Sequence, residues 1–332
     1  MKKSLIALAV LAASGASFAQ STVSVYGIVD ASLAYITNDN GTTSTSTTNM
    51  LSGAVSGSRW GLKGSEDLGG GLKANFKLEQ GFNVDSGSAG VAGQAFSRYS
   101  YVGFSGGFGE IKLGKTGTAY DDVQGASDAV FDSALSPMNS VFKSTGYAWN
   151  PDNTIYYQAP TYSGFSGALS YSLGEDKTAV LGASSTTSLN LTYGAGPLAV
   201  NFGYQTEDKN TTADDTSFTR LGAAYTFGPA TLKATYGKTS NIGNVNGADA
   251  TDWQLGADYA VSTALTVSAS LAQSADNVTA GDFTRKGFGL GAAYTLSKRT
   301  FVYGGYEADT TTKTGLADTK HSVFAVGVQH NF

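Results

Sequence analysis

The feature that most constrains this chain is an alternation of apolar and polar residues with a period of two, repeated in segments of about ten residues. In the first such segment, one parity comprises Val23, Val25, Gly27, Val29, Ala31, Leu33 and Tyr35. The other parity includes Ser24, Tyr26, Asp30 and Ser32. Successive side chains of a strand point to opposite faces, so this segment predicts a strand with one apolar and one mostly polar face.

The same alternation recurs to the C-terminus, where the outward parity comprises Phe324, Val326, Val328, His330 and Phe332. The segments number about sixteen, an even number, as in bacterial single-chain membrane barrels. Short connections (66–71, 194–197, 228–229, 297–299) alternate with longer ones rich in Thr, Asn, Asp and Gly (37–50, 207–215, 241–248, 309–318). This sidedness predicts an all-β fold, a 16-stranded antiparallel transmembrane β-barrel. Small β domains joined by disordered linkers are the alternative, but no shift in composition marks a boundary.

The composition agrees with strands and excludes several other classes. The chain has 43 glycines, 18 Tyr, 17 Phe, 5 prolines, no cysteine and a formal net charge of −5. Aromatic residues favour strands, and glycine is tolerated at turns or beside a lumen. The absence of cysteine excludes disulfides and thiolate metal sites, and the negative charge argues against a nucleic-acid partner.

Residues 1–19 have the organisation of a secretory signal peptide. Lys2 and Lys3 give a positive start, residues 5–13 are apolar, and small residues lead to Ala19. This apolar run is roughly half the length that a spanning helix needs. We therefore expect cleavage after Ala19 and one barrel domain over residues 20–332. No later apolar run approaches the ~18 residues of a spanning helix, which excludes a helical membrane protein.

Five motifs carry a resemblance that covers the whole chain. They are residues 22–30 (TVSVYGIVD), 58–74 (SRWGLKGSEDLGGGLKA), 108–114 (FGEIKLG), 296–304 (LSKRTFVYG) and 327–332 (GVQHNF). On these residues the chain resembles the trimeric general porins of Gram-negative bacteria, in particular the β-proteobacterial type. The second and fourth motifs are the most specific, whereas a terminal Phe alone indicates only an outer-membrane barrel.

The resemblance implies a homotrimer in the cell outer membrane, in contact with lipid and lipopolysaccharide. It implies that the C-terminal strand, ending at Phe332, is recognised by the barrel-assembly machinery. It also implies that the third external loop folds inward and narrows each pore. We expect this loop at about residues 115–150, the longest stretch between strands.

In such porins, arginines of the barrel wall face acidic residues of the inward loop. The matching positions here are Arg59, Arg98 and Glu79 on the wall and Asp121, Asp122, Asp128 and Asp132 in the loop. By parity, Asp30, Lys63, Lys77 and Lys112 add lumen-facing charge. One family feature is missing, because residues 149–153 (WNPDN) lack the arginine that often precedes the sixth strand.

Other motifs are better explained by strands. Residues 109–116 (GEIKLGKT) match a phosphate-loop pattern, but Ile111 and Leu113 alternate with Lys112 and no helix start follows. Gly287, Gly289 and Gly291 are interpreted as small lumen-side positions rather than a dinucleotide loop.

The only histidines, His321 and His330, lie on opposite faces of the last strand and cannot share a zinc ion. His321 is expected at the end of a loop. We expect no enzyme activity, no cofactor and no dedicated metal site, although weak calcium binding by acidic loops stays open.

The sequence therefore predicts passive diffusion of small hydrophilic solutes and ions, with weak selectivity and a slight preference for anions. A solute-specific channel remains an alternative. So does a structural or adhesive barrel whose loops are the working surface.

Overall fold

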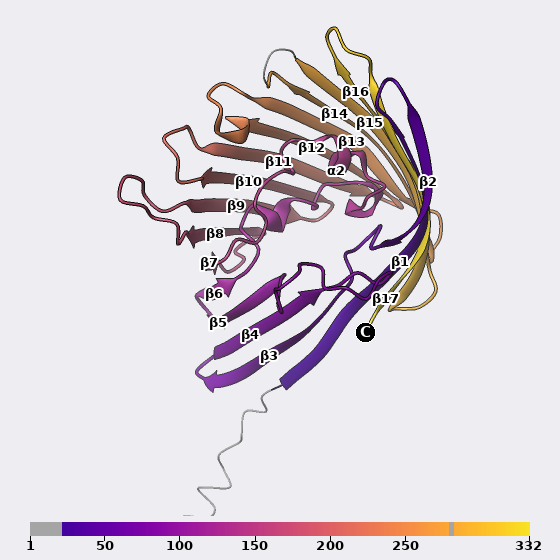
Figure 1. Ribbon diagram of the computed structural model, residues 1–332. Coiled ribbons are helices and arrows are strands. Elements are labelled where there is room, and N and C mark those ends of the chain that lie inside the picture. Colours follow the sequence, from indigo (N-terminus) through magenta and orange to yellow (C-terminus); the bar gives the residue numbers. More distant parts are fainter. Residues whose placement is uncertain (1–21, 279–281) are drawn as a thin grey trace, which may run out of the picture.

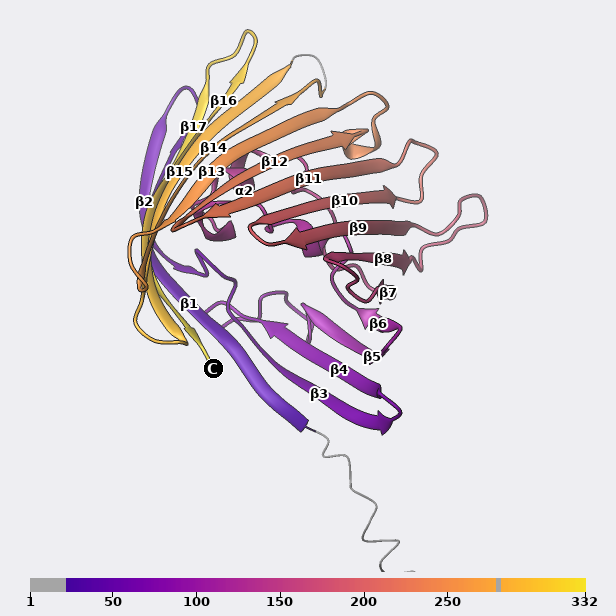
Figure 2. The same ribbon diagram turned by 180° about the vertical axis from the view of Figure 1, so that it is seen from behind.

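The chain forms one barrel of strands around a central space (Figures 1 and 2). The computed structural model describes residues 22–278 and 282–332. The predicted signal peptide, residues 1–19, lies outside the described residues.

Over the described residues, the sheet contains seventeen strand segments, each paired antiparallel with its neighbours. They are β1 (Thr22–Asp39), β2 (Ser44–Ser52), β3 (Arg59–Gly69), β4 (Leu72–Gly81), β5 (Tyr99–Gly106), β6 (Gly109–Lys115), β7 (Thr154–Gln158), β8 (Phe165–Leu173), β9 (Ser185–Ala195), β10 (Leu198–Asp208), β11 (Thr216–Phe227), β12 (Ala230–Ser240), β13 (Ala250–Ala260), β14 (Leu265–Asp276), β15 (Phe283–Thr295), β16 (Thr300–Lys313) and β17 (Thr319–Asn331). Short helices are η1 (Asp121–Val123), η2 (Val130–Asp132), α2 (Pro137–Val141) and η3 (Ile242–Asn244).

The seventeen segments occupy sixteen positions around the barrel. β2 pairs with the second half of β1 and β3 with the first half, so β2 and β3 are two pieces of one strand position interrupted at residues 53–58. β1 also pairs with β17 from Ile28 opposite Asn331 to Asp39 opposite Lys320, which closes the barrel. The predicted 16-stranded antiparallel barrel is confirmed.

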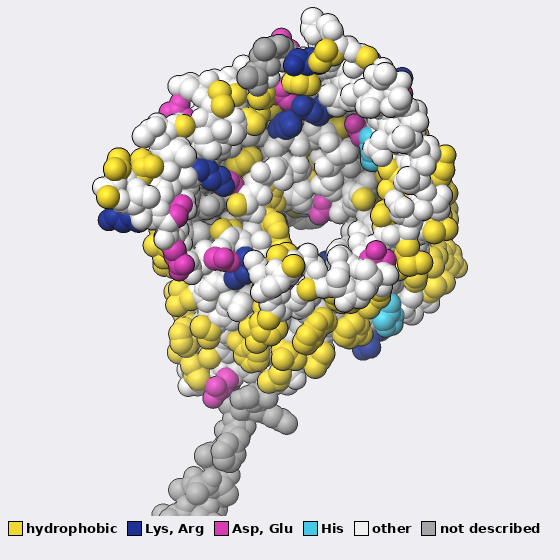
Figure 3. All heavy atoms as spheres, in the orientation of Figure 1, with side chains coloured by type: hydrophobic (Ala, Val, Ile, Leu, Met, Phe, Trp, Pro, Cys, Tyr) yellow, Lys and Arg dark blue, Asp and Glu magenta, His cyan; other side chains and the backbone are white. Residues whose placement is uncertain are grey.

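The two faces of each strand differ as the alternation predicts. In β10, Asn201, Gln205 and Glu207 are buried, whereas Tyr204 is exposed. In β14, Ser270 and Ser274 are buried and Leu271 is 59% exposed. Hydrophobic side chains gather on the outer surface in Figure 3, which also shows an opening through the middle of the barrel. An apolar outer band around a polar interior is what a barrel in a lipid bilayer requires.

The tight turns lie where the sequence predicts them, but two predicted long loops are shorter than expected. In the predicted loop 309–318, β16 continues to Lys313 and leaves only 314–318 as the connection. Gly196 and Gly228 both adopt φ +55°, which glycine tolerates without a Cβ clash, and each is followed by proline. Residues 37–50 are mostly strand, because β1 and β2 leave only 40–43 as a connection. Polar β-branched threonines there pair across the hairpin, and Thr37 Oγ1 lies 2.9 Å from Ser46 Oγ.

The longest connection, residues 116–153, joins β6 to β7 and carries η1, η2 and α2. Of the helices within residues 22–278 and 282–332, none has the length and apolar character of a membrane span.

Candidate functional site

Glu79 on β4 is the centre of a cluster of charged side chains on the wall. Tyr26 Oη donates a hydrogen bond of 2.7 Å to Glu79 Oε2, and Arg98 Nε donates one of 2.7 Å to Oε1. Lys77 Nζ lies 3.3 Å from the same carboxylate, whose side chain is only 3% exposed. Three polar partners offset the cost of burying the Glu79 charge. The structure therefore brings together three of the sequence-predicted residues, Lys77, Glu79 and Arg98.

Aromatic rings hold the two cations of this cluster in place. Lys77 Nζ lies 3.6 Å from the centroid of Tyr99, and the Arg98 guanidinium carbon lies 5.0 Å from the centroid of Trp149. The ring face carries negative potential, so both contacts are attractive. Trp149 lies in residues 149–153, which lack the arginine that the family often has there. In this structure Trp149 instead helps to position Arg98.

Arg59 and Lys63 on β3 are charges without an acidic partner. Arg59 Nε donates to the carbonyl of Gly57 at 3.0 Å, and Lys63 Nζ lies 5.0 Å from the Tyr26 ring. Within the part of the chain that the structure describes, neither has a carboxylate oxygen within 4.0 Å. Arg59 is opposite Gly81 on β4, and the stem of Arg98 crosses that glycine. The two guanidinium side chains therefore extend from adjoining positions.

Lys112 on β6 lies near a second tyrosine. Its Nζ is 4.4 Å from the Tyr156 centroid and 3.3 Å from Glu110. We refer to Arg59, Lys63, Lys77, Arg98 and Lys112 as the cationic wall cluster. They come from β3, β4, β6 and the residue before β5.

Asp30 on β1 is fully buried and does not face open solvent. Its carboxylate accepts hydrogen bonds from Tyr303 Oη and from the Ser56 amide, the latter at 2.8 Å. Asp30 therefore holds residues 53–58, which separate β2 from β3, against the wall. The alternation predicted a lumen-facing charge at Asp30 but not this structural role.

The 116–153 segment is docked on the polar face of the wall from β8 to β16. The amides of Ala119 and Tyr120 donate to Ser170 Oγ at 3.2 Å and Ser188 Oγ at 2.6 Å. Further along, the amide of Val130 donates to Ser268 Oγ at 2.7 Å. Wall hydroxyls thus satisfy amides that the irregular backbone leaves unpaired.

Three acidic wall side chains anchor the later part of the segment. Asp252 accepts from the Ser144 amide at 2.8 Å, and Glu207 accepts from the Ala148 amide at 2.6 Å. Glu307 accepts from Ser140 Oγ at 2.6 Å. Hydrogen bonds to charged acceptors are stronger than neutral ones, so these acids tie the segment to β10, β13 and β16.

Glycines of the wall make room for the segment. A Cβ at Gly203 would lie 2.9 Å from Val123, and one at Gly256 would lie 2.5 Å from the Cβ of Ala129. At Gly289 and Gly291 it would meet Leu135 and Phe131. The interpretation of the glycines at 287–291 as small lumen-side positions is therefore supported, and the segment is what occupies the space.

The four acidic residues predicted in the segment lie in different surroundings. Asp121 accepts from Tyr147 Oη at 2.7 Å, and Asp122 accepts from Tyr156 Oη at 2.6 Å. Asp128 is 1% exposed and accepts from Ser136 Oγ at 2.6 Å. Asp132 is exposed, with Asn139 Nδ2 at 3.4 Å.

Burial raises the pKa of three of these carboxyls. It raises the pKa of Asp121 to about 6 and that of Asp128 to about 7, and it also raises the pKa of Asp122. The cause is desolvation, which disfavours the charged form and outweighs the hydrogen bonds that favour it. The negative charge of the segment therefore depends on pH near neutrality.

Arg220 on β11 is a functional candidate that sequence reasoning missed. Its side chain is fully buried, and it donates to the carbonyl of Gln124 at 2.6 Å and to Ser144 Oγ at 3.2 Å. It thereby joins an early part of the segment to a later one. Arg220 occupies the polar parity of its strand, so the alternation could have identified it as lumen-facing, but not as a partner of this segment.

These features define a class of protein: a closed β-barrel with an apolar outer band, a polar interior and a long connection docked on the inner wall, which is the build of an outer-membrane channel. Comparison with known proteins gives the family. The chain matches the Gram-negative porin family model over residues 5–314 and belongs to that family.

Individual relatives agree with this assignment. The chain is 35% identical over 321 residues to outer membrane porin protein 32 of Delftia acidovorans, covering 92% of this chain and 88% of that one. It is 30% identical to an outer membrane porin protein of Bordetella pertussis over the full length of both chains. Among solved structures, it is similar to an anion-selective porin from Comamonas acidovorans, with a TM-score of 0.78, 26% identity and coverage of 94% and 100%. The protein is therefore an outer-membrane diffusion channel of a Gram-negative bacterium and not an enzyme.

Proposed function

We propose that the channel is narrowest between the docked 116–153 segment and the cationic wall cluster. The observation that carries this proposal is the distribution of contacts around the wall. The segment docks against β8 to β16, whereas the cluster comes from β3 to β6, where the end of the segment contacts Arg98 through Trp149 and Asn150. Solutes that pass along the barrel then have fixed positive charge on one side and the segment on the other.

We further propose weak selectivity with a slight preference for anions. Five cations line this part of the wall, and among the described residues only Glu79 and Glu110 lie within ion-pair distance of them. In the segment, burial raises the pKa of Asp121, Asp122 and Asp128, which disfavours their charged forms, whereas Asp132 is exposed. Charges at close quarters set ion preference, so five wall cations opposed by these acids favour anions weakly. Similarity to a porin described as anion-selective supports the same sign.

The assembly and the partners are proposals that rest on the family. We propose three copies per assembly, contact with lipid and lipopolysaccharide around the apolar band, and recognition of the C-terminal strand by the barrel-assembly machinery. We also propose residues 1–19 as the signal peptide and residues 20–332 as the barrel domain.

Recording in a planar bilayer tests the function. Across a KCl gradient, the reversal potential should indicate weak anion preference, since the two ions have similar mobility and the wall charge decides the sign. Openings should occur in groups of three equal steps. A strong cation preference would contradict the assigned role of the wall cluster, and single ungrouped steps would contradict the trimer.

A further inference from the structure

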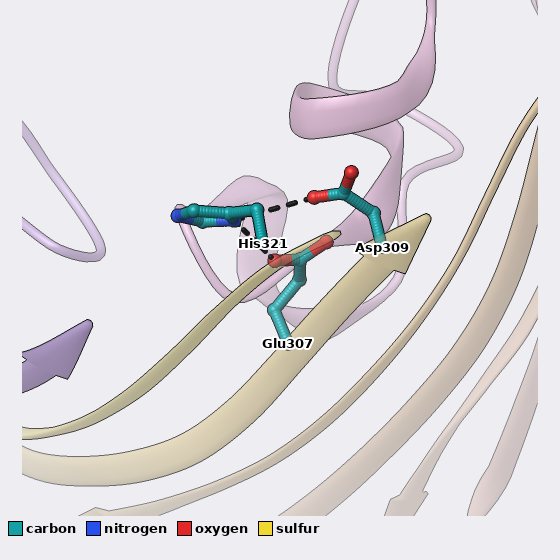
Figure 4. A group of neighbouring side chains, drawn as sticks. All are labelled: Glu307, Asp309 and His321. Carbon is teal, nitrogen blue, oxygen red and sulfur yellow. Dashed lines mark hydrogen bonds and ion pairs between the residues drawn. The ribbon is translucent and has the colours of Figure 1, made fainter. Parts of the chain in front are cut away.

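The C-terminal strand pair brings three metal-ligating side chains together at the end of the barrel remote from the chain terminus. They are Glu307 and Asp309 on β16 and His321 on β17, and their donor atoms all lie within 4.8 Å of one another. Figure 4 shows the two carboxylates and the imidazole turned toward one another. His321 is the third residue of β17, next to the connection from β16, in keeping with its expected place at the end of a loop.

Strand register explains the convergence. Asp309 is directly opposite His321 in the β16–β17 ladder, and Glu307 lies two residues earlier on the same face of β16. Residues two apart share a face, and directly opposed residues have neighbouring Cβ atoms. The sequence alone does not give this register, because the pairing depends on which residues the β16–β17 connection aligns.

The spacing of the donor atoms matches a small divalent cation. His321 Nδ1 lies 3.2 Å from Asp309 Oδ2 and 3.4 Å from Glu307 Oε2. In a tetrahedral zinc site with bonds near 2.0–2.2 Å, neighbouring ligand atoms are about 3.3–3.5 Å apart. Three protein ligands leave the fourth position for water, as in open zinc sites.

Glu307 provides a second, independent observation. Its side chain is 0% exposed, and Oε2 has no hydrogen bond among the described residues, its one polar contact being His321 Nδ1 at 3.4 Å. A buried carboxylate oxygen without a hydrogen bond is costly unless a cation is beside it. The other oxygen, Oε1, accepts from Ser140 Oγ of α2, which fixes the orientation of the carboxylate.

An ion can reach this group from solvent. His321 is 38% exposed at its side chain and lines a depression of about 350 Å³ together with Asp309, Asn38, Asp39 and Lys320. The site therefore combines a buried ligand, a partly buried ligand and an accessible imidazole.

We propose that Glu307, Asp309 and His321 form a binding site for one divalent transition metal ion of the zinc class. Imidazole nitrogen with two carboxylates suits zinc, nickel or copper. Calcium is disfavoured because it requires six to eight oxygen ligands, and this group offers one nitrogen and two carboxylates.

The chain provides its own control, since its only other histidine is His330. His330 is exposed on the opposite face of β17, with its Nδ1 2.8 Å from Thr300 Oγ1. The protein should be purified without a histidine tag, stripped with EDTA and titrated with Zn²⁺ alone by calorimetry. Wild type and His330→Gln should bind one ion with the same affinity, and His321→Gln should lose at least about tenfold in affinity.

Two further variants keep the test decisive. Glu307→Gln and Asp309→Asn remove one charge each with almost no change of shape, and each should weaken Zn²⁺ binding by at least about tenfold. Zn²⁺ should also raise the melting temperature of wild type and His330→Gln but not of His321→Gln. Equal binding by wild type and His321→Gln, no binding by wild type, or displacement of Zn²⁺ by equimolar Ca²⁺ would each overturn the proposal. None of these readouts depends on ion conduction.

Discussion

At the scale of single residues, the charges of the wall differ in how far they are neutralised. Glu79 lies within ion-pair distance of both Lys77 and Arg98, so much of this charge cancels locally. Arg59 has no such partner among the described residues and bonds only to the backbone of Gly57 through Nε. Its charge is therefore less neutralised by direct ion pairs than the charges of Lys77 and Arg98.

Replacing Arg59 by Gln should reduce anion preference. Two unit charges about 4 Å apart interact by about 1 kcal/mol in water, so we expect the anion-to-cation permeability ratio to fall by about two- to fivefold. Reversal potentials across a KCl gradient measure this ratio. The control is Arg299→Gln, which removes an exposed arginine in the turn between β15 and β16. Equal effects of both variants would show that the position of Arg59 does not matter.

The raised pKa values of Asp121 and Asp128 predict that selectivity depends on pH. Between pH 8 and pH 5 both carboxyls take up protons, because burial raises their pKa to about 6 and about 7. The segment then loses about two negative charges, and anion preference should increase. Reversal potentials at several pH values test this. The double variant Asp121→Asn with Asp128→Asn should respond less, and an unchanged response would assign the effect to other groups.

The same pKa values give the sign of a stability effect. For both carboxyls the pKa in the folded protein is above the unfolded value of about 4, so the folded state favours the protonated form. Their contribution to stability is complete below about pH 4 and is lost as the pH rises through about 6 and about 7.

At the scale of elements, the 116–153 segment is held by tertiary contacts against its local preferences. Val130, Phe131 and Asp132 all have positive φ, at 59°, 68° and 47°. The left-handed region costs roughly 1–2 kcal/mol for each residue with a Cβ. Hydrogen bonds from the Val130 amide to Ser268 and from Ser133 Oγ to the Val130 carbonyl offset this cost. The wall therefore determines the path of the segment.

Removing an anchor should loosen the segment without opening the barrel. Asp252→Ala leaves the amides of Lys143 and Ser144 without their acceptor, which should cost about 1–3 kcal/mol of stability. We expect a lower melting temperature in detergent and noisier open-channel current. Asp85→Ala, at an exposed position in the connection from β4 to β5, is the matched control. If Asp252→Ala has the open-channel current noise and the melting temperature of the wild type, the anchoring role is contradicted.

At the scale of the whole molecule, the barrel is closed by its two chain ends. The Phe332 amide donates to the Gly27 carbonyl at 3.0 Å, and the Gly27 amide donates to the Phe332 carbonyl at 3.0 Å. A Cβ at Gly27 would lie 2.3 Å from the Phe332 ring, so the ring covers this glycine. Phe332 is nevertheless 46% exposed on the outer face, which leaves it available for recognition during assembly.

Replacing Phe332 by Ala separates recognition from closure, because both backbone hydrogen bonds to Gly27 remain. If the assembly machinery recognises this ring, Phe332→Ala should strongly reduce folded protein in the outer membrane of cells while refolding into detergent micelles changes little. Heat-modifiable migration on gels measures both. Phe227→Ala, which removes an exposed aromatic ring at the end of β11, is the control. Equal losses in cells and in micelles would instead assign Phe332 to closure of the barrel alone.

The sequence determined the wall of this protein. A period of two follows from the geometry of a single strand, so the apolar outer face, the sixteen strand positions and the lumen-facing parity of Arg59, Lys77 and Glu79 could all be predicted locally. Motif resemblance added the family and the segment between β6 and β7. The prediction of a loop at 37–50 was wrong because threonine-rich polar stretches suit both strands and loops.

Only the tertiary structure decided what lies inside the wall. The contact between Val130 and Ser268 and the bonds of Arg220 to Gln124 and Ser144 join residues that are far apart in the chain. Such pairings depend on barrel closure and strand register, which no local pattern encodes. The same holds for Asp309 opposite His321: alternation predicts which face a side chain occupies, but register alone decides which side chain it meets.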